Sequence, residues 1–277
     1  MNLLYQLFKF YINSSLHVAF AVGSFTVITC INFNISIDYS LLLFVFSSTV
    51  VAYNFVKYYT LFKSLKHSLS LKFIQVLSFL FLLIVIVCMF YLNMQSLVLF
   101  IILGVFTLLY SLPFLPQTKN LRDISGLKIF IIAFVWTGTT VLSPFFEQGL
   151  NHKLIETDLI WYTLSRFFLI IALTIPFEIR DHVLDSDDLK TLPQLVGVKS
   201  SKLIGGLLCV ISLLCLNLGA GHIVLIELLL YIMVIIFITF TSTTNSVYYT
   251  SFWVESIPIF WLLFNFCFNN GQDFSIL

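Results

Sequence analysis

The sequence predicts an all-α integral membrane protein in which about nine transmembrane helices form a single transmembrane domain over residues 1–277. Of the residues, 60% are hydrophobic and 10% are charged, against roughly 25% charged residues in an ordinary soluble domain. The apolar residues come in continuous runs of about 17 to 21, enough to cross the hydrocarbon layer as a helix. Because these runs do not alternate in polarity, the sequence favours helices over the strands of a membrane barrel.

Nine apolar stretches define the predicted helices in order. They cover residues 16–33, 41–55, 73–91, 97–115, 127–146, 159–177, 203–218, 223–240 and 252–268. The first stretch lacks a strongly basic leader and a clear small-residue cleavage site, so we expect a permanent helix and not a cleaved signal. The connections are mostly too short to fold as domains of their own.

The distribution of positive charge predicts the topology. Lysine and arginine gather before the first stretch and after the second, fourth and sixth, at Lys9, Lys57, Lys63, Lys66, Lys72, Lys119, Arg122, Lys128, Arg180, Lys190, Lys199 and Lys202. Cytoplasmic loops collect positive charge during insertion, so we expect a cytoplasmic N-terminus and a C-terminus on the opposite side. The net charge of +1 gives no indication of a nucleic-acid partner.

The polar segment after the sixth stretch is the strongest candidate for a functional site on the cytoplasmic face. Five of the thirteen acidic residues lie within positions 178–188. If the sixth helix continues past the membrane surface, Asp181 and Asp185 share one helical face, with Glu178 beside Asp181. Two such carboxylates suit Mg²⁺, which prefers hard oxygen ligands and often takes the rest from water and a substrate phosphate. The alternative is a solvated loop in which Arg180 and Lys190 pair locally with the acids.

The same segment resembles the second aspartate motif of the UbiA superfamily of intramembrane prenyltransferases. It reads Glu-Ile-Arg-Asp from Glu178 to Asp181, followed by Asp185, Thr-Leu-Pro at 191–193 and Gly197. The gap before the Thr-Leu-Pro sequence is one residue shorter than is usual in that family. The resemblance implies a UbiA-type helical bundle, and nine helices with cytoplasmic even-numbered loops are also what the family has.

A second similarity to the family follows the fourth stretch. Tyr-Ser-Leu-Pro at 110–113, then basic residues and Gly-Leu-Lys at 126–128, is similar to the family's tyrosine and lysine segment. This implies that Tyr110, Arg122 and Lys128 meet a diphosphate. Alternatively, Tyr110 is an interfacial aromatic anchor and the basic residues only set the topology.

The chain departs from the family in the second stretch, where a first aspartate-rich motif is expected. Asn54 matches that motif, but Phe55, Tyr58 and Phe62 stand at its aspartate positions. No acidic residue occurs between positions 38 and 123. One half of the family's metal site is therefore missing from the sequence.

Lys57 lies within this altered stretch. An ammonium can serve as a point-charge partner for phosphate, so Lys57 could bind the phosphate directly. Alternatively, it only anchors the helix at the cytoplasmic surface, in which case replacing it by Met would leave phosphate binding unchanged.

Three further ionisable residues in or near the apolar stretches are candidates for function, because a charge in hydrocarbon is costly. Arg166 could snorkel, bind a lipid headgroup or contact a substrate. Glu227 could bond to a neighbouring helix. Glu255 faces the cytoplasmic end of the last stretch and could join the site.

The resemblance implies transfer of a polyprenyl group from its diphosphate to an acceptor, with Mg²⁺ assisting the loss of diphosphate. Asp181 and Asp185 would then be catalytic and would hold the metal. The implied substrate-binding residues are Asn54, Lys57, Tyr110, Arg122, Lys128 and Arg180. The expected partners are membrane lipid, a polyprenyl diphosphate and an acceptor of unknown identity. The alternative function is a catalytically degenerate protein that binds an isoprenoid lipid or acts as a membrane partner subunit.

Overall fold

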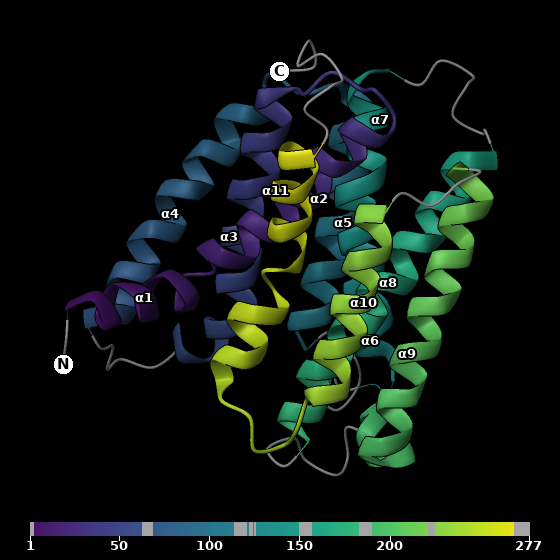
Figure 1. Ribbon diagram of the computed structural model, residues 1–277. Helices are drawn as coiled ribbons and strands as arrows, with labels where there is room; N and C mark the ends of the chain where they lie inside the picture. Colours follow the sequence, from purple (N-terminus) through teal and green to yellow (C-terminus); the bar gives the residue numbers. More distant parts are fainter. Residues whose placement is uncertain are drawn as a thin grey trace.

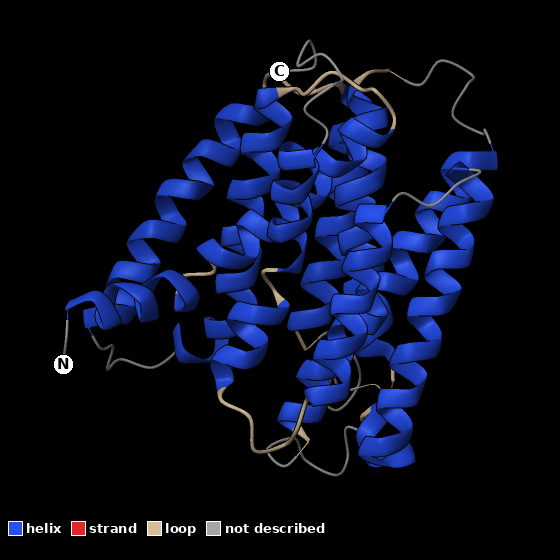
Figure 2. Ribbon diagram, in the orientation of Figure 1, coloured by secondary structure: helices blue, strands red, loops and turns tan. Residues whose placement is uncertain are grey.

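The computed structural model describes residues 3–62, 69–113, 121, 124, 126–149, 157–182, 190–220 and 225–268. In this part of the chain the regular structure is entirely helical (Figure 2). Most helices run along one bundle direction, whereas α1 lies across the side of the bundle (Figure 1). The predicted all-α fold class is confirmed.

The helices follow the predicted apolar stretches, except that the first helix, Leu3–Asn13, precedes all of them and was not predicted. They are α1 (Leu3–Asn13), α2 (Leu16–Asn32), α3 (Tyr39–Phe62), α4 (Leu69–Met89), α5 (Met94–Ser111), α6 (Leu127–Thr137), η3 (Gly138–Leu142), α7 (Ser143–Glu147), α8 (Thr157–Asp181), α9 (Leu192–Ala220), α10 (Leu225–Phe240), η6 (Tyr249–Val254) and α11 (Ile257–Phe268). Two short π-helical turns, η3 and η6, interrupt apolar stretches that the sequence alone predicts as single helices.

The number of spans is close to the predicted nine. Within the described residues, seven helical segments are long and apolar enough to cross a membrane, and α1 with α2 makes an eighth as a pair bent by 56°. The remaining stretch forms α10, an apolar helix of 16 residues that is shorter than a typical span. The chain is thus an integral, multi-pass membrane protein.

The buried core surrounds α8. Side chains of α2, α6, α9, α10 and α11 pack in it, among them Phe25, Leu230 and Ile257. Arg166 of α8 also lies in this core and is only 2% exposed. It does not reach the surface, so its interpretation as a snorkelling or headgroup-binding residue is wrong.

The outer helices carry the lipid-facing surface. On α4 the side chains of Phe79, Leu83 and Val87 are all exposed, as expected for a helix whose apolar surface faces hydrocarbon. The side chains of α4 are largely exposed, whereas many of those of α8 are buried. We therefore look for polar chemistry in the interior of the bundle.

Thr191 and Gly197, which follow the acidic segment in the sequence, have structural roles at the start of α9. The Thr191 backbone N–H donates to Gln194 Oε1 at 2.8 Å, which satisfies one of the unpaired amides at the helix start. Gly197 then adopts φ 81° and ψ 159° and kinks the helix. A glycine suits this position because side chains rarely adopt such a positive φ.

Candidate functional site

A charged cavity lies where the ends of several helices meet, at the lower end of the bundle in Figure 1. The end of α3, the start of α6, the end of α8 and the η6–α11 junction supply its charged walls. We call it the head cavity, and it has a volume of about 420 Å³. The charged residues that line it, among those that the structure describes, are Lys57, Lys128, Glu178, Arg180, Asp181 and Glu255. Three of these side chains are cationic and three are carboxylates.

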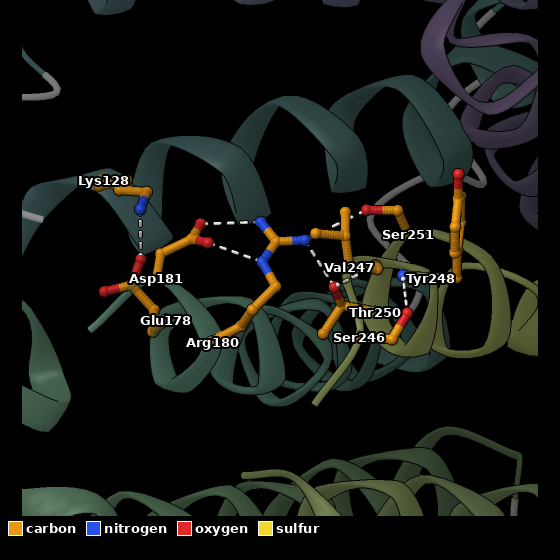
Figure 3. Close-up of polar contacts among 9 residues, drawn as sticks. All are labelled: Lys128, Glu178, Arg180, Asp181, Ser246, Val247, Tyr248, Thr250 and Ser251. Atoms are coloured by element: carbon orange, nitrogen blue, oxygen red, sulfur yellow. Dashed lines mark hydrogen bonds and ion pairs between the residues drawn. The ribbon is translucent and has the colours of Figure 1, made fainter. Parts of the chain in front are cut away.

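An ion pair joins α6 to α8 in one wall of the head cavity. The Lys128 Nζ lies 2.6 Å from Glu178 Oε1, and the Glu178 side chain is only 4% exposed (Figure 3). Lys128 is the second residue of α6, and Gly126, with φ 70°, directly precedes that helix. Glu178, expected beside Asp181 on a metal-binding face, instead has a lysine partner.

Arg180 holds the second carboxylate. Its Nε and Nη2 donate to Asp181 Oδ1 and Oδ2 at 2.6 and 2.8 Å, so both carboxylate oxygens are bound. Its Nη1 donates to Thr250 Oγ1 at 2.6 Å and to Ser251 Oγ at 3.1 Å. Figure 3 shows the guanidinium between Asp181 on one side and the two η6 hydroxyls on the other.

Lys57 and Glu255 complete the charged lining. Lys57 is exposed, and its Nζ donates to Ser15 Oγ at 3.1 Å. Glu255 lines the same cavity as Lys57 and Arg180. The hypothesis that Glu255 joins the site therefore agrees with its place in the cavity wall.

Asn54 is not among the residues that line the head cavity. It is fully buried, and its Oδ1 accepts from Ser15 Oγ at 2.8 Å. Its Nδ2 donates to the Ser14 carbonyl at 3.0 Å and to Ser78 Oγ at 2.9 Å. These hydrogen bonds connect the bend between α1 and α2 with α3 and α4. The Ser15 hydroxyl that donates to Asn54 also accepts from Lys57 and so helps to position it.

A second cavity of about 240 Å³ adjoins the head cavity, and we call it the apolar cavity. Its walls come mainly from α3, α5 and α6 and are largely apolar, with Phe44, Phe100 and Val135 among them. The two cavities share the side chains of Tyr53, Val56, Tyr110, Ile132 and Trp136. At this shared wall the Trp136 indole N–H donates to the Tyr53 hydroxyl at 2.8 Å.

The described residues do not fit the Mg²⁺ site that the resemblance implies. Both oxygens of Asp181 are bound by Arg180, and no group of three His, Cys, Asp or Glu side chains in the described chain could hold a metal ion. Asp181 is the last residue of α8, and the shared helical face of Asp181 and Asp185 stays a prediction. Asp185 itself lies outside the described residues.

The structure brings together most of the substrate-binding residues that the sequence suggests. Lys57, Tyr110, Lys128 and Arg180 all line the head cavity, together with Asp181, which the resemblance implies as a metal ligand. Asn54 is buried and does not line the cavity, as described above. Arg122 lies outside the described residues.

Sequence reasoning missed four residues of this region. Thr250 and Ser251 hold Arg180, and their one visible signal is a pair of hydroxyls within an otherwise aromatic run before Glu255. Tyr53 and Trp136 form the wall between the cavities. Aromatic residues are so common in this chain that no sequence signal separates these two from lipid-facing ones.

No known protein family and no curated protein matches the sequence. Solved structures do match in fold. A UbiA homologue from Archaeoglobus fulgidus bound to GPP and Mg²⁺ superposes with a TM-score of 0.58 at 13% identity, over 94% of this chain and 96% of that chain. The same homologue bound to DMAPP and Mg²⁺ also gives a TM-score of 0.58, at 12% identity over 94% and 96% of the two chains.

A digeranylgeranylglyceryl phosphate synthase gives a TM-score of 0.55 at 17% identity, over 95% of this chain and 97% of that chain. The match in each case extends over almost the whole of both chains. The predicted resemblance to the UbiA superfamily is confirmed in the fold, and this chain is a membrane protein with the UbiA fold.

Proposed function

We propose that the protein binds a polyprenyl diphosphate and transfers its prenyl group to an acceptor. One observation carries the proposal: a largely apolar cavity adjoins a charged cavity across a shared wall of five side chains. An isoprenoid diphosphate has the same division into an apolar tail and a charged head. The UbiA fold, with solved homologues bound to GPP or DMAPP, supports this assignment.

The proposed reaction breaks the bond between C1 of the prenyl group and the diphosphate oxygen. The diphosphate leaves with the electron pair, and the acceptor nucleophile forms a bond to C1 and then loses a proton. Lys57, Lys128 and Arg180 line the cavity in which the charge of the leaving group would develop. Fixed cations in a partly enclosed site stabilise such charge without much reorganisation.

The proposal includes the orientation in the membrane. With a cytoplasmic N-terminus, the end of the bundle that carries the head cavity lies on the cytoplasmic side and the C-terminus lies on the other. An isoprenoid tail in the apolar cavity would be surrounded by α3, α5 and α6. Membrane lipid covers the exposed apolar faces of the outer helices.

Binding without transfer is the second candidate function. Two observations favour it. The α8 carboxylates Glu178 and Asp181 already bind side-chain cations. The stretch that corresponds to the first motif also has no acidic residue. A partner subunit that binds an isoprenoid lipid would keep the cavities without the reaction. The two candidates differ in whether labelled prenyl group leaves its diphosphate.

The test uses purified protein in detergent and labelled geranylgeranyl diphosphate. Gly104 lines the apolar cavity, and a Cβ added there would meet nothing within 4 Å. Gly104→Phe should therefore fill the cavity and weaken binding by about tenfold or more, as expected for lost tail burial. Gly206→Phe is the matched control, because Gly206 lies outside both cavities and is equally open.

Equal binding by both glycine variants would overturn the assignment of the tail to the apolar cavity. Transfer is measured separately, by incubating the protein and labelled substrate with a membrane lipid extract and following a new labelled product. A product above the no-protein control supports the transferase, whereas binding without product supports the second candidate.

A further inference from the structure

We propose that the head cavity recognises the phosphates of its ligand without Mg²⁺, through Lys57 and Arg180, and that Asp181 is an exchangeable counter-ion for Arg180. The inference rests on the proposed function, because it concerns the charged end of the same ligand. It gives Asp181 a role opposite to that of a metal ligand. Asp181 would compete with the phosphate for Arg180 and not help to bind it.

The first step of the argument is the charge balance of the cavity. Among the described residues, its lining carries three cations and three carboxylates, so an entering phosphate would compete with these carboxylates for the cations. The carboxylates differ in how easily they can be displaced. The Glu178 side chain is 4% exposed and forms an ion pair with Lys128. The Asp181 side chain is 26% exposed and can turn toward water.

The second step is the way in which Arg180 is held. Thr250 and Ser251 accept hydrogen bonds from Nη1 and so hold the guanidinium independently of Asp181. Its Nε and Nη2 edge binds both oxygens of Asp181. The same planar edge fits two oxygens of a phosphate in the same bidentate manner, so one ligand can replace the other without moving the arginine.

The third step concerns Lys57. An ammonium carries three N–H donors, and Ser15 accepts one of them. Lys57 lies in the cavity wall on the helical stretch from which the aspartates of the family motif are missing. This wall therefore carries a positive charge in place of the negative charges that a shared metal would need.

The experiment measures binding of inorganic diphosphate and of geranylgeranyl diphosphate to the full chain in detergent, in EDTA and in excess Mg²⁺. Geranylgeraniol, which has no phosphate, reports the contribution of the tail alone. We expect geranylgeranyl diphosphate to bind in EDTA within about twofold of its affinity in Mg²⁺, and more tightly than geranylgeraniol by about tenfold or more. Inorganic diphosphate should bind weakly, but with the same independence of metal.

The variants separate the counter-ion role from the metal-ligand role by the sign of the effect. Asp181→Asn should tighten diphosphate binding by about fivefold, because a competing charge-assisted hydrogen bond is removed. Lys57→Met should weaken it by about tenfold. Lys72→Met is the matched control, since Lys72 is an exposed lysine of α4 outside the cavity, and it should leave the affinity unchanged.

Loss of binding in Asp181→Asn, or binding that requires Mg²⁺, would overturn this inference and leave the proposed function in place. Equal binding of geranylgeraniol and its diphosphate would overturn it as well, while keeping an isoprenoid-binding protein. Failure of all three ligands in every buffer would instead overturn the proposed function. Unchanged elution in size-exclusion chromatography and an unchanged melting temperature identify variants that fold normally.

Discussion

Two arginines on α8 carry the same charge in opposite surroundings. Arg180 lines the head cavity, where Asp181 and two hydroxyls bind its guanidinium. Arg166, about 21 Å away along the helix at 1.5 Å per residue, is 2% exposed. Its Nη2 donates to the Tyr162 hydroxyl at 2.6 Å, and its guanidinium carbon lies 3.9 Å from the centre of the Phe25 ring.

The difference lies in what compensates each charge. Tyr162 and Trp261 also turn ring faces toward Arg166, at 5.4 and 5.5 Å, and within the described part of the chain its Nη1 has no hydrogen-bond partner. Aromatic faces attract a desolvated cation through their quadrupoles, by about 2 kcal/mol or more in favourable cases. Arg166 is thus held by the packing of the core, whereas the carboxylate that binds Arg180 is one that a ligand could replace.

The largest expected effect is on the stability of the core around Arg166. Arg166→Ala removes the side chain that Phe25, Tyr162 and Trp261 surround, and should lower the free energy of unfolding by about 3 kcal/mol, the scale of a large-to-small core substitution. The measurement is the thermal unfolding midpoint in detergent. Arg166→Met, which refills the space without a buried charge, should cost about 1 kcal/mol. An Ala variant as stable as the parent chain would show that the aromatic cluster does not depend on the arginine.

The ion pair beside Arg180 should show the next largest effect. Lys128→Met leaves the sealed Glu178 carboxylate without its partner, and we expect a loss of about 2 kcal/mol, somewhat below the 3–5 kcal/mol of a fully buried broken pair. The double variant with Glu178→Leu should recover most of that loss, because it removes the uncompensated charge. Additive losses in the double variant would mean that the pair is not coupled.

Arg180 itself should contribute less to stability than either of these. Arg180→Gln should cost about 1 kcal/mol or less, because Asp181 is partly exposed and can be hydrated instead. The same change should weaken geranylgeranyl diphosphate binding by about tenfold. If unfolding shifts as far as in Arg166→Ala, the distinction between a core arginine and a cavity arginine fails.

The smallest expected effect is the response to salt. Raising NaCl from about 0.1 to 0.5 M should weaken diphosphate binding by about threefold, because charges in an open cavity are screened. The stability difference between the parent chain and Arg166→Ala should stay constant over that range, since buried charges are screened much less. Binding titrations at both salt concentrations test the expected screening in the head cavity. Unfolding midpoints of the parent chain and Arg166→Ala at the same concentrations test the expected lack of screening around Arg166.

The sequence contained most of the fold and part of the site. Continuous apolar runs identify the helices because every backbone group in lipid must be bonded within the chain, and each predicted stretch is helical in the structure. The acidic segment pointed to Arg180 and Asp181, because several charges beside an apolar run are unusual. The π-helical turns η3 and η6 were not predicted, since they depend on side chains packed from other helices.

By itself, the sequence determined that this protein is a helical membrane protein and that its charges gather at one end of the bundle, because hydrophobic length and charge distribution are local properties. The tertiary structure decided which charges meet. It paired Glu178 of α8 with Lys128 of α6, and it buried Asn54 among its hydrogen-bond partners while placing Lys57 in the cavity wall. Asp181 instead pairs with its sequence neighbour Arg180, which is the local pairing that the sequence left open. The sequence could not predict the partner of Glu178, because that partner lies on another helix that only packing brings near.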